Sequence, residues 1–172
     1  ISGHKIQGLK GSGLLAFRKK PQLKAFIVGG GQEFGLRSGT VAVPQAVSLA
    51  KAARLAVEGM PENFENFKKW SADLHHFFEQ FGQEVYVLSP KDGAPHILSF
   101  SVRGLKGEIL INALQKRDII VSTSSACSSK QTKTSHVVEA MNIDSRYKNG
   151  VLRLSFGANN TDEDIAAFKK QF

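Results

Sequence analysis

The sequence predicts an α/β protein, with helices in the middle of the chain and short strands alternating with helices after them. Apolar residues between 64 and 81 recur at spacings of three, four or seven, which is the pattern of one helix face. From Val85 the spacing changes to the alternation of apolar and polar residues that is typical of strands. Two glycine-rich loops precede both patterns. The 172 residues are enough for one or two compact units.

Composition argues against several classes of protein. The formal net charge is +8 at pH 7, but the basic residues are scattered among acidic ones and form no recognisable nucleic-acid motif. No apolar run approaches the roughly 20 residues of a transmembrane helix. A single cysteine excludes an intrachain disulfide and a cysteine-built zinc site, and it fits a reducing compartment. We therefore expect a cytoplasmic protein that binds neither nucleic acid directly nor a membrane.

The first predicted element is a glycine-rich loop that carries Lys5. Four glycines fall within residues 3–13, a composition that lets backbone approach a ligand. A short apolar strand is predicted at 14–17, and either an apolar strand or an apolar approach segment at 26–28. The loop is not a Walker A motif, because no Gly-Lys-Ser/Thr tripeptide follows, and it lacks the third glycine of the dinucleotide-binding fingerprint. A ligand-binding lysine loop and a plain turn are both compatible with this pattern.

A second glycine-rich loop covers residues 29–40, with five glycines in twelve positions. It is predicted to lead into a helix that begins near 41–44, where a proline suits the first turn, and that ends near Gly59. Ser38 and Thr40 are candidates either to cap this helix or to meet a phosphate at its positive end.

The next helix is predicted from Pro61 and buries a stripe of apolar side chains. The stripe consists of Phe64, Phe67, Leu74, Phe78 and Phe81. His75 and His76 are adjacent, so they point to different faces of the helix and cannot chelate one metal together. We interpret them as surface or packing residues and expect no metal site.

Beyond Gly82, strands and helices are predicted to alternate. The predicted strands are 85–88, 96–102, 119–121 and 151–156, and the predicted helices are 107–115, one from 133 and one from 161. In the last strand Arg153 and Ser155 share one face. An arginine beside a serine in a strand often marks an anion site, and a surface ion pair is the alternative. Thr161 and Asp164 have the spacing of a capping box.

Cys127, the only cysteine, lies in a predicted loop of small polar residues. Of its seven neighbours between Ser122 and Ser129, six carry hydroxyl groups, so no apolar side chain is available to bury the thiol. Lys130 and Lys133 are close enough in sequence to favour the thiolate, which is the nucleophilic form. The loop suits a thiol that moves and reacts, and an incidental loop cysteine is the alternative.

Four motifs occur in this chain in one order: Ser-Gly-His-Lys with its glycine loop, Gly-Gly-Gly-Gln-Glu before Leu-Arg-Ser-Gly-Thr, Ser-Ala-Cys-Ser-Ser, and Leu-Arg-Leu-Ser-Phe-Gly. Together they resemble the cysteine desulfurases, pyridoxal-phosphate enzymes of the class V aminotransferase group. The resemblance implies the C-terminal portion of a fold type I enzyme. The end of the large cofactor-binding domain would be residues 1–40, connecting helices 41–81, and a small α+β domain carrying the cysteine loop 82–172.

The resemblance also implies how the cofactor, pyridoxal 5′-phosphate, would be held. Lys5 would bond to it covalently, and Ser2 and His4 would approach its phosphate. Thr40 would reach the phosphate held by the neighbouring subunit of a homodimer. The sequence departs from the family at Leu9, where proline is usual.

The substrate implied by the resemblance is L-cysteine, which would be converted to L-alanine. Arg153 would bind its carboxylate, and Cys127 would keep its sulfur as a persulfide, which makes Lys5 and Cys127 the expected catalytic residues. Ser124 stands where the family often has glycine. The sulfur would pass to an acceptor protein, either an iron–sulfur scaffold or a tRNA-thiolation enzyme, and the sequence does not choose between them.

Three interpretations therefore compete: a desulfurase, a related enzyme such as selenocysteine lyase or an aminotransferase, and a non-catalytic fragment or binding module. Both ends of the chain look cut, and the family's aspartate and histidine that contact the cofactor ring are not in this sequence. We therefore expect an incomplete portion that is inactive alone. We also expect apolar surface to be exposed around Leu14, Leu15 and Phe17.

Overall fold

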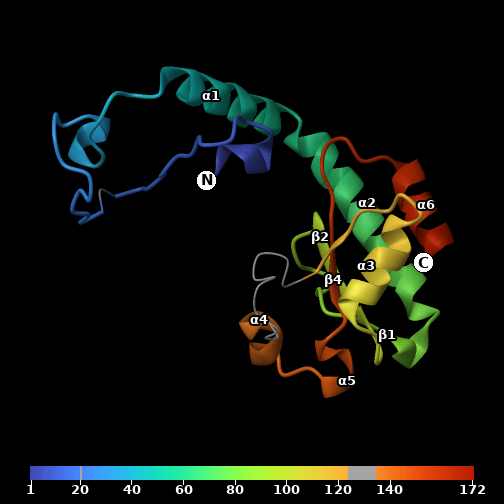
Figure 1. Ribbon diagram of the computed structural model, residues 1–172. Helices are drawn as coiled ribbons and strands as arrows, with labels where there is room; N and C mark the ends of the chain where they lie inside the picture. Colours follow the sequence, from blue (N-terminus) through green and yellow to red (C-terminus); the bar gives the residue numbers. More distant parts are fainter. Residues whose placement is uncertain (20, 124–134) are drawn as a thin grey trace. The chain divides into compact units, whose positions relative to one another are not determined.

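A computed structural model describes residues 1–19, 21–123 and 135–172. The chain divides into two compact units, Ile1–Met60 and Pro61–Phe172, and each is described by itself. Figure 1 shows the elements of both.

The first unit combines two loops with one long helix. It contains the short 3-10 helices η1 (Gly3–Ile6) and η2 (Glu33–Gly35) and the α-helix α1 (Val43–Glu58). The strand predicted at 14–17 is wrong, and the strand alternative at 26–28 is wrong as well, because neither segment pairs with another strand among the described residues. An isolated bridge between Ser2 and Gly13 is the only β-type pairing described there.

Helix α1 starts and ends close to the predicted positions. A proline occupies its first turn, and Gly59 caps its C-terminus by donating its backbone N–H to the Leu55 carbonyl. The prediction that Ser38 or Thr40 caps the helix is wrong, since the N-cap is Ala42 and makes no side-chain hydrogen bond. Ser38 is buried instead, and its hydroxyl accepts a hydrogen bond from the Gly31 backbone at 3.3 Å.

The second unit is built on an antiparallel sheet of order β1-β2-β4-β3. The strands are β1 (Val85–Val87), β2 (Ile97–Val102), β3 (Ser122–Thr123) and β4 (Val151–Ser155). Strand β4 pairs with β2 on one side and with β3 on the other, so that it is an interior strand. Because directly paired residues lie on the same face of a sheet, the register decides which side chains surround Arg153.

Helices and turns cover this sheet. They are α2 (Met60–Glu79), η3 (Gly82–Glu84), α3 (Gly107–Gln115), α4 (His136–Ala140), α5 (Ser145–Lys148) and α6 (Asp162–Gln171). The predicted capping box at the start of α6 is confirmed, because Thr161 and Asp164 exchange both hydrogen bonds. None of the described helices is long and apolar enough to cross a bilayer.

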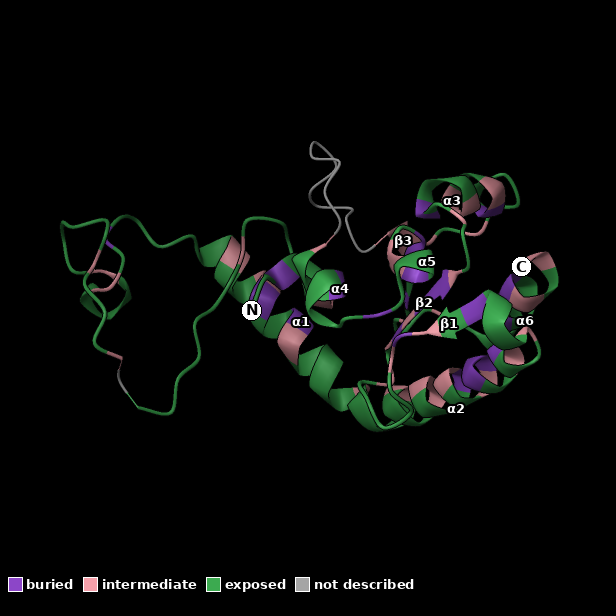
Figure 2. Cartoon of the chain, turned by 90° about the horizontal axis from the view of Figure 1, so that it is seen from below, coloured by how far each residue is buried: buried purple, intermediate pink, exposed green. Residues whose placement is uncertain are grey.

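The main core lies where one face of the sheet meets α2 and α6. Leu98, Phe100 and Leu152 are fully buried there, and the ring of Phe100 lies 4.6 Å from that of Phe78 on α2. Figure 2 shows the buried residues of α2 and α6. A hydrogen bond of 2.6 Å from the Trp70 indole to Asp162 joins these two helices.

The opposite face of the sheet is buried only in part. A smaller cluster of Leu88, Val138, Ile143, Tyr147 and Val151 covers it at one end. Further along β4, the side chains of Arg153 and Ser155 are exposed. The two-faced pattern predicted for this strand is confirmed.

Some predictions for this unit are wrong in detail. The strand expected at 119–121 is wrong, because the strand in this region, β3, begins only at Ser122. Ile119 and Val121 pack against the core, whereas the side chain of Ile120 turns outward and is 79% exposed. Phe64, expected in the core stripe, is also substantially exposed. The predicted start of a helix at 133 lies outside the described residues, and α4 begins at His136.

His75 provides a pH test of the second unit. Its side chain is buried, and Nε2 has no hydrogen-bond partner among the residues that the structure describes. Burial, together with the charge of Lys91, lowers the pKa of His75 below the ordinary value of 6.5. The unfolded chain therefore binds this proton at a higher pH than the folded chain does, so stability should fall as pH drops below about 6.5. Urea unfolding at pH 7.5 and 5.5 measures this loss.

The matched variants are His75→Leu and His76→Ala. The first should reduce the loss of stability between the two pH values, because it removes the buried titrating group. The second should leave the loss nearly unchanged, since His76 is exposed beside Glu79. Equal pH dependence in wild type and His75→Leu would contradict the assignment.

Candidate functional site

The lysine loop presents Lys5 on a short and well-fixed turn. Lys5 lies in η1, and its side chain is exposed. Gln7 ends this turn in the left-handed region with φ of 65°, and the next residue, Gly8, donates its backbone N–H to the Gly3 carbonyl at 2.8 Å. Ser2 and His4 flank the turn and are also exposed. The structure thus brings Ser2, His4 and Lys5 together in one loop.

Backbone contacts hold this loop to the rest of the first unit. The Gly3 N–H donates to the Ser12 carbonyl at 2.9 Å, and the Leu9 N–H donates to the Ser48 hydroxyl on α1 at 3.1 Å. Gly3 is buried, and a Cβ at this position would overlap the Ser12 side chain. A larger residue at this position would therefore have to push the Ser12 hydroxyl aside, whereas glycine leaves room for this contact.

The second glycine-rich loop is fixed by its own polar contacts. The Gln32 side-chain carbonyl accepts the Gly39 N–H at 3.0 Å, and Arg37 donates to the Ser38 carbonyl at 2.8 Å. Glu33 and Phe34 both adopt positive φ, 53° and 58°, a conformation that non-glycine residues rarely take. Strain of this kind persists only where surrounding contacts hold the backbone, and it is frequent at functional loops.

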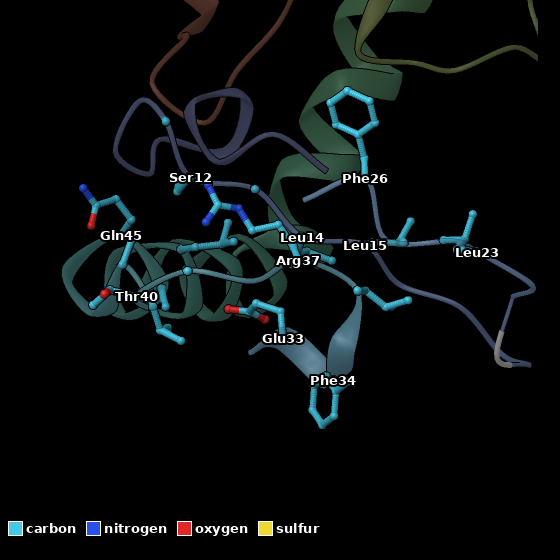
Figure 3. Close-up of a pocket in the computed structure, with 18 of the residues that line it drawn as sticks. Ser12, Leu14, Leu15, Leu23, Phe26, Glu33, Phe34, Arg37, Thr40 and Gln45 are labelled. Atoms are coloured by element: carbon cyan, nitrogen blue, oxygen red, sulfur yellow. The ribbon is translucent and has the colours of Figure 1, made fainter. Parts of the chain in front are cut away.

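A hollow of about 750 Å³ lies between these loops and α1. Thr40, Arg37 and Glu33 contribute polar groups to its lining, and much of the rest is apolar. Figure 3 shows the rings of Phe26 and Phe34 projecting outward beside this hollow, and these rings are 99% and 93% exposed. Gly11, Ser12 and Gly13 of the lysine loop line this hollow, whereas Lys5 is not among its lining residues.

Apolar exposure in the first unit agrees with expectation. Leu14, Leu15 and Phe17 are 37%, 64% and 49% exposed, as predicted from the sequence. Single exposed apolar residues are common on protein surfaces, but several on one short segment indicate a surface that packs against another part of a protein.

Arg153 lies in the second unit, at the centre of a small polar face. It pairs with Ser99 of β2 and Ser122 of β3, so hydroxyl-bearing residues occupy the register positions on both sides. Its Nε donates a hydrogen bond of 3.1 Å to the Ser155 hydroxyl. In the described part of the chain Arg153 forms no ion pair, so the surface ion pair considered above does not occur there.

Cys127 lies outside the described residues. The described chain stops at Thr123 in β3 and resumes at Ser135, the residue before α4. The residues expected to influence the thiol, Lys130 and Lys133, also lie in this gap. Within the described ranges, no group of three histidine, cysteine, aspartate or glutamate side chains could hold a metal ion.

The model of the aminotransferase class-V family matches residues 1–168. The chain belongs to this family. A cysteine desulfurase IscS from Clostridium botulinum is 39% identical over 168 residues, which cover 96% of this chain and 42% of the relative. Cysteine desulfurase IscS from Escherichia coli is 38% identical over the same length, covering 96% of this chain and 41% of the relative.

A solved structure described as a NifS-like protein matches with a TM-score of 0.85 and 35% identity, covering 99% of this chain and 43% of that chain. This similarity confirms the predicted fold, that of part of a fold type I member of the aminotransferase class-V family. The chain spans less than half the length of the relatives it matches.

Two residues that fix the loops of this class V chain were missed from the sequence, Ser48 and Gln32. Ser48 lies within a helix and contacts Leu9, 39 residues away in the sequence, so no local sequence pattern predicts this contact. The contact of Gln32 was easier to predict, because a side-chain amide beside three glycines can accept hydrogen bonds from nearby backbone N–H groups.

Proposed function

We propose that this chain is part of a cysteine desulfurase that uses pyridoxal 5′-phosphate. The observation that carries the proposal is the exposed Lys5 on a loop fixed to α1, in a class V chain similar to cysteine desulfurases. A cofactor that bonds to a lysine amine needs that lysine accessible and its backbone held in place. The lysine loop meets both conditions, so the residues present fit the cofactor.

Four residues of this chain would hold the cofactor. Lys5 would bond to it covalently, and Ser2 and His4, in the same exposed loop, would contact its phosphate. Thr40, at the end of the second glycine loop, would contact the phosphate in the neighbouring subunit of a homodimer. When bound, the cofactor supplies an electron sink for the negative charge that develops at the substrate Cα.

Three side chains of this chain would bind the substrate and carry out the reaction. Arg153 binds the carboxylate of L-cysteine, and the free amine of Lys5 takes the proton from Cα. The Cys127 thiolate attacks the substrate sulfur, so that a sulfur–sulfur bond forms while the carbon–sulfur bond breaks. The electron pair of the broken bond stays on the substrate Cβ, which takes up one proton, and the proton held by Lys5 returns to Cα. The products are L-alanine and a Cys127 persulfide, and no external oxidant or reductant is needed.

The complete enzyme would contain a region that this chain lacks, as its longer relatives do. We propose a division into the end of a large domain at 1–40, connecting helices at 41–81 and a small domain at 82–172. The apolar surface around Leu14, Leu15 and Phe17 would be covered by the region that the longer relatives have in addition. We propose that the enzyme is cytoplasmic and passes sulfur to an acceptor protein, an iron–sulfur scaffold or a tRNA-thiolation enzyme, and that these 172 residues alone form no alanine.

Replacing Cys127 by alanine tests the reaction type. In the complete cofactor-loaded enzyme, Cys127→Ala should abolish sulfide release from L-cysteine in the presence of a reductant, because the sulfur has no acceptor. An aminotransferase would keep its activity, since it needs no thiol. Alanine and sulfide are both measured, with Ser129→Ala, two residues away, as the control. Undiminished alanine and sulfide formation by Cys127→Ala would contradict the proposal.

A further inference from the structure

We propose that Ser155 is a positioning residue that sets the orientation of the Arg153 guanidinium for a substrate carboxylate. The Arg153 Nε donates to the Ser155 hydroxyl at 3.1 Å, and both side chains lie on the exposed part of one face of β4. The inference rests on the proposed function, because it assigns to Arg153 the binding of the carboxylate of L-cysteine.

The hydrogen bond to Ser155 determines which N–H groups of the Arg153 guanidinium remain free for a carboxylate. A guanidinium is planar and carries one N–H on Nε and four on the two Nη atoms. When Ser155 occupies Nε, the Nε–Nη edge is no longer free for a side-on contact. The two Nη atoms remain, and they bind a carboxylate end-on through two parallel hydrogen bonds.

The strand makes Ser155 well suited to this task. Residues two apart on a strand point to the same face, so a short serine side chain reaches Nε without crossing the sheet. Serine also loses little conformational entropy when its hydroxyl is held, compared with a long side chain. The guanidinium is therefore oriented before the substrate arrives, which lowers the entropy lost on binding.

The neighbouring strands leave the substrate side open. The residues paired with Arg153 are Ser99 and Ser122, which are small and uncharged. A carboxylate at either position would compete for the guanidinium, and a large side chain would cover it. Neither occurs at these two paired positions, and among the described residues Ser155 is the polar contact of the exposed Arg153 side chain.

The hydrogen bond itself is tested in the chain alone by nitrogen-15 NMR of arginine side chains. The Arg153 Nε–Hε signal, assigned by its loss in Arg153→Lys, should exchange slowly with water in the wild type. It should exchange faster in Ser155→Ala and stay protected in Ser155→Thr, which restores a hydroxyl. Unchanged exchange in Ser155→Ala would overturn the proposed contact.

The consequence for substrate is tested in the complete cofactor-loaded enzyme. Ser155→Ala should raise KM for L-cysteine by about three- to tenfold, the effect of one net hydrogen bond, with little change in kcat. Ser155→Thr should restore KM, and Ser145→Ala, an exposed serine of the same unit, should not change it.

The outcomes separate the inference from the proposed function. If Arg153→Ala raises KM and Ser155→Ala does not, the positioning role is overturned while the desulfurase function stands. If the wild-type enzyme makes no alanine from L-cysteine, the proposed function is overturned, and the inference falls with it. A fall in kcat with unchanged KM in Ser155→Ala would also overturn the positioning role.

Discussion

Replacing Lys5 with alanine should lower the rate of alanine formation from L-cysteine by at least about 10²- to 10⁴-fold, the range that general acid–base catalysis alone contributes. The loss should be larger still, because the covalent anchor of the cofactor is removed in the same step. Steady-state alanine production by the complete enzyme, with cofactor supplied in excess, measures the effect. Cofactor absorbance shows in parallel whether the ring is still bound.

Lys10→Ala is the matched control for this change, because Lys10 belongs to the same glycine-rich loop and is also exposed. Its substitution removes the same charge five residues further along. We expect near wild-type activity, since no role is assigned to Lys10. Similar losses in both variants would indicate a charge effect of the loop and would contradict the specific role of Lys5.

Replacing Arg153 with alanine should reduce kcat/KM for L-cysteine by roughly 30- to 1000-fold, which corresponds to the loss of about 2–4 kcal/mol from a charge-assisted two-point contact. The loss should be expressed mainly in KM, because the carboxylate is bound in both the ground state and the transition state. The colour of the bound cofactor should persist. Arg153→Lys should recover only part of the loss, because an ammonium group cannot form the planar two-point contact.

Arg103→Ala provides the control for Arg153. Arg103 lies in the same unit and forms a surface ion pair with Glu84 at 3.5 Å. Such pairs contribute little, so neither KM nor the folded structure should change appreciably. An unchanged KM in Arg153→Ala would remove Arg153 from the substrate site.

The second unit could be predicted well from its sequence because its elements bury one face against their neighbours. The alternation of apolar and polar residues along 151–156 and the apolar stripe on α2 both indicate which side chains enter the core. The prediction was poorer at 119–121, where three β-branched residues indicated a buried strand but the chain leaves Ile120 exposed. A run of three residues without alternation does not specify a register.

The first unit was harder to predict, because its apolar segments have no partner in the described structure. Residues 14–17 and 26–28 have the composition of strands, yet a strand forms only when another strand completes its hydrogen bonds. The loop that carries Lys5 could be predicted from its glycines. The contact of Ser48 with Leu9 could not, because it joins residues far apart in the sequence.

The most direct test of the account is the mass of the peptide that contains Cys127 after the complete enzyme has reacted with L-cysteine in the absence of a reductant. We predict a mass increase of one sulfur atom on Cys127 in the wild type, released by a reductant. The same peptide should be unmodified in Lys5→Ala. Accumulation of alanine while Cys127 stays unmodified would contradict the claim that this chain carries the sulfur-accepting cysteine of a desulfurase.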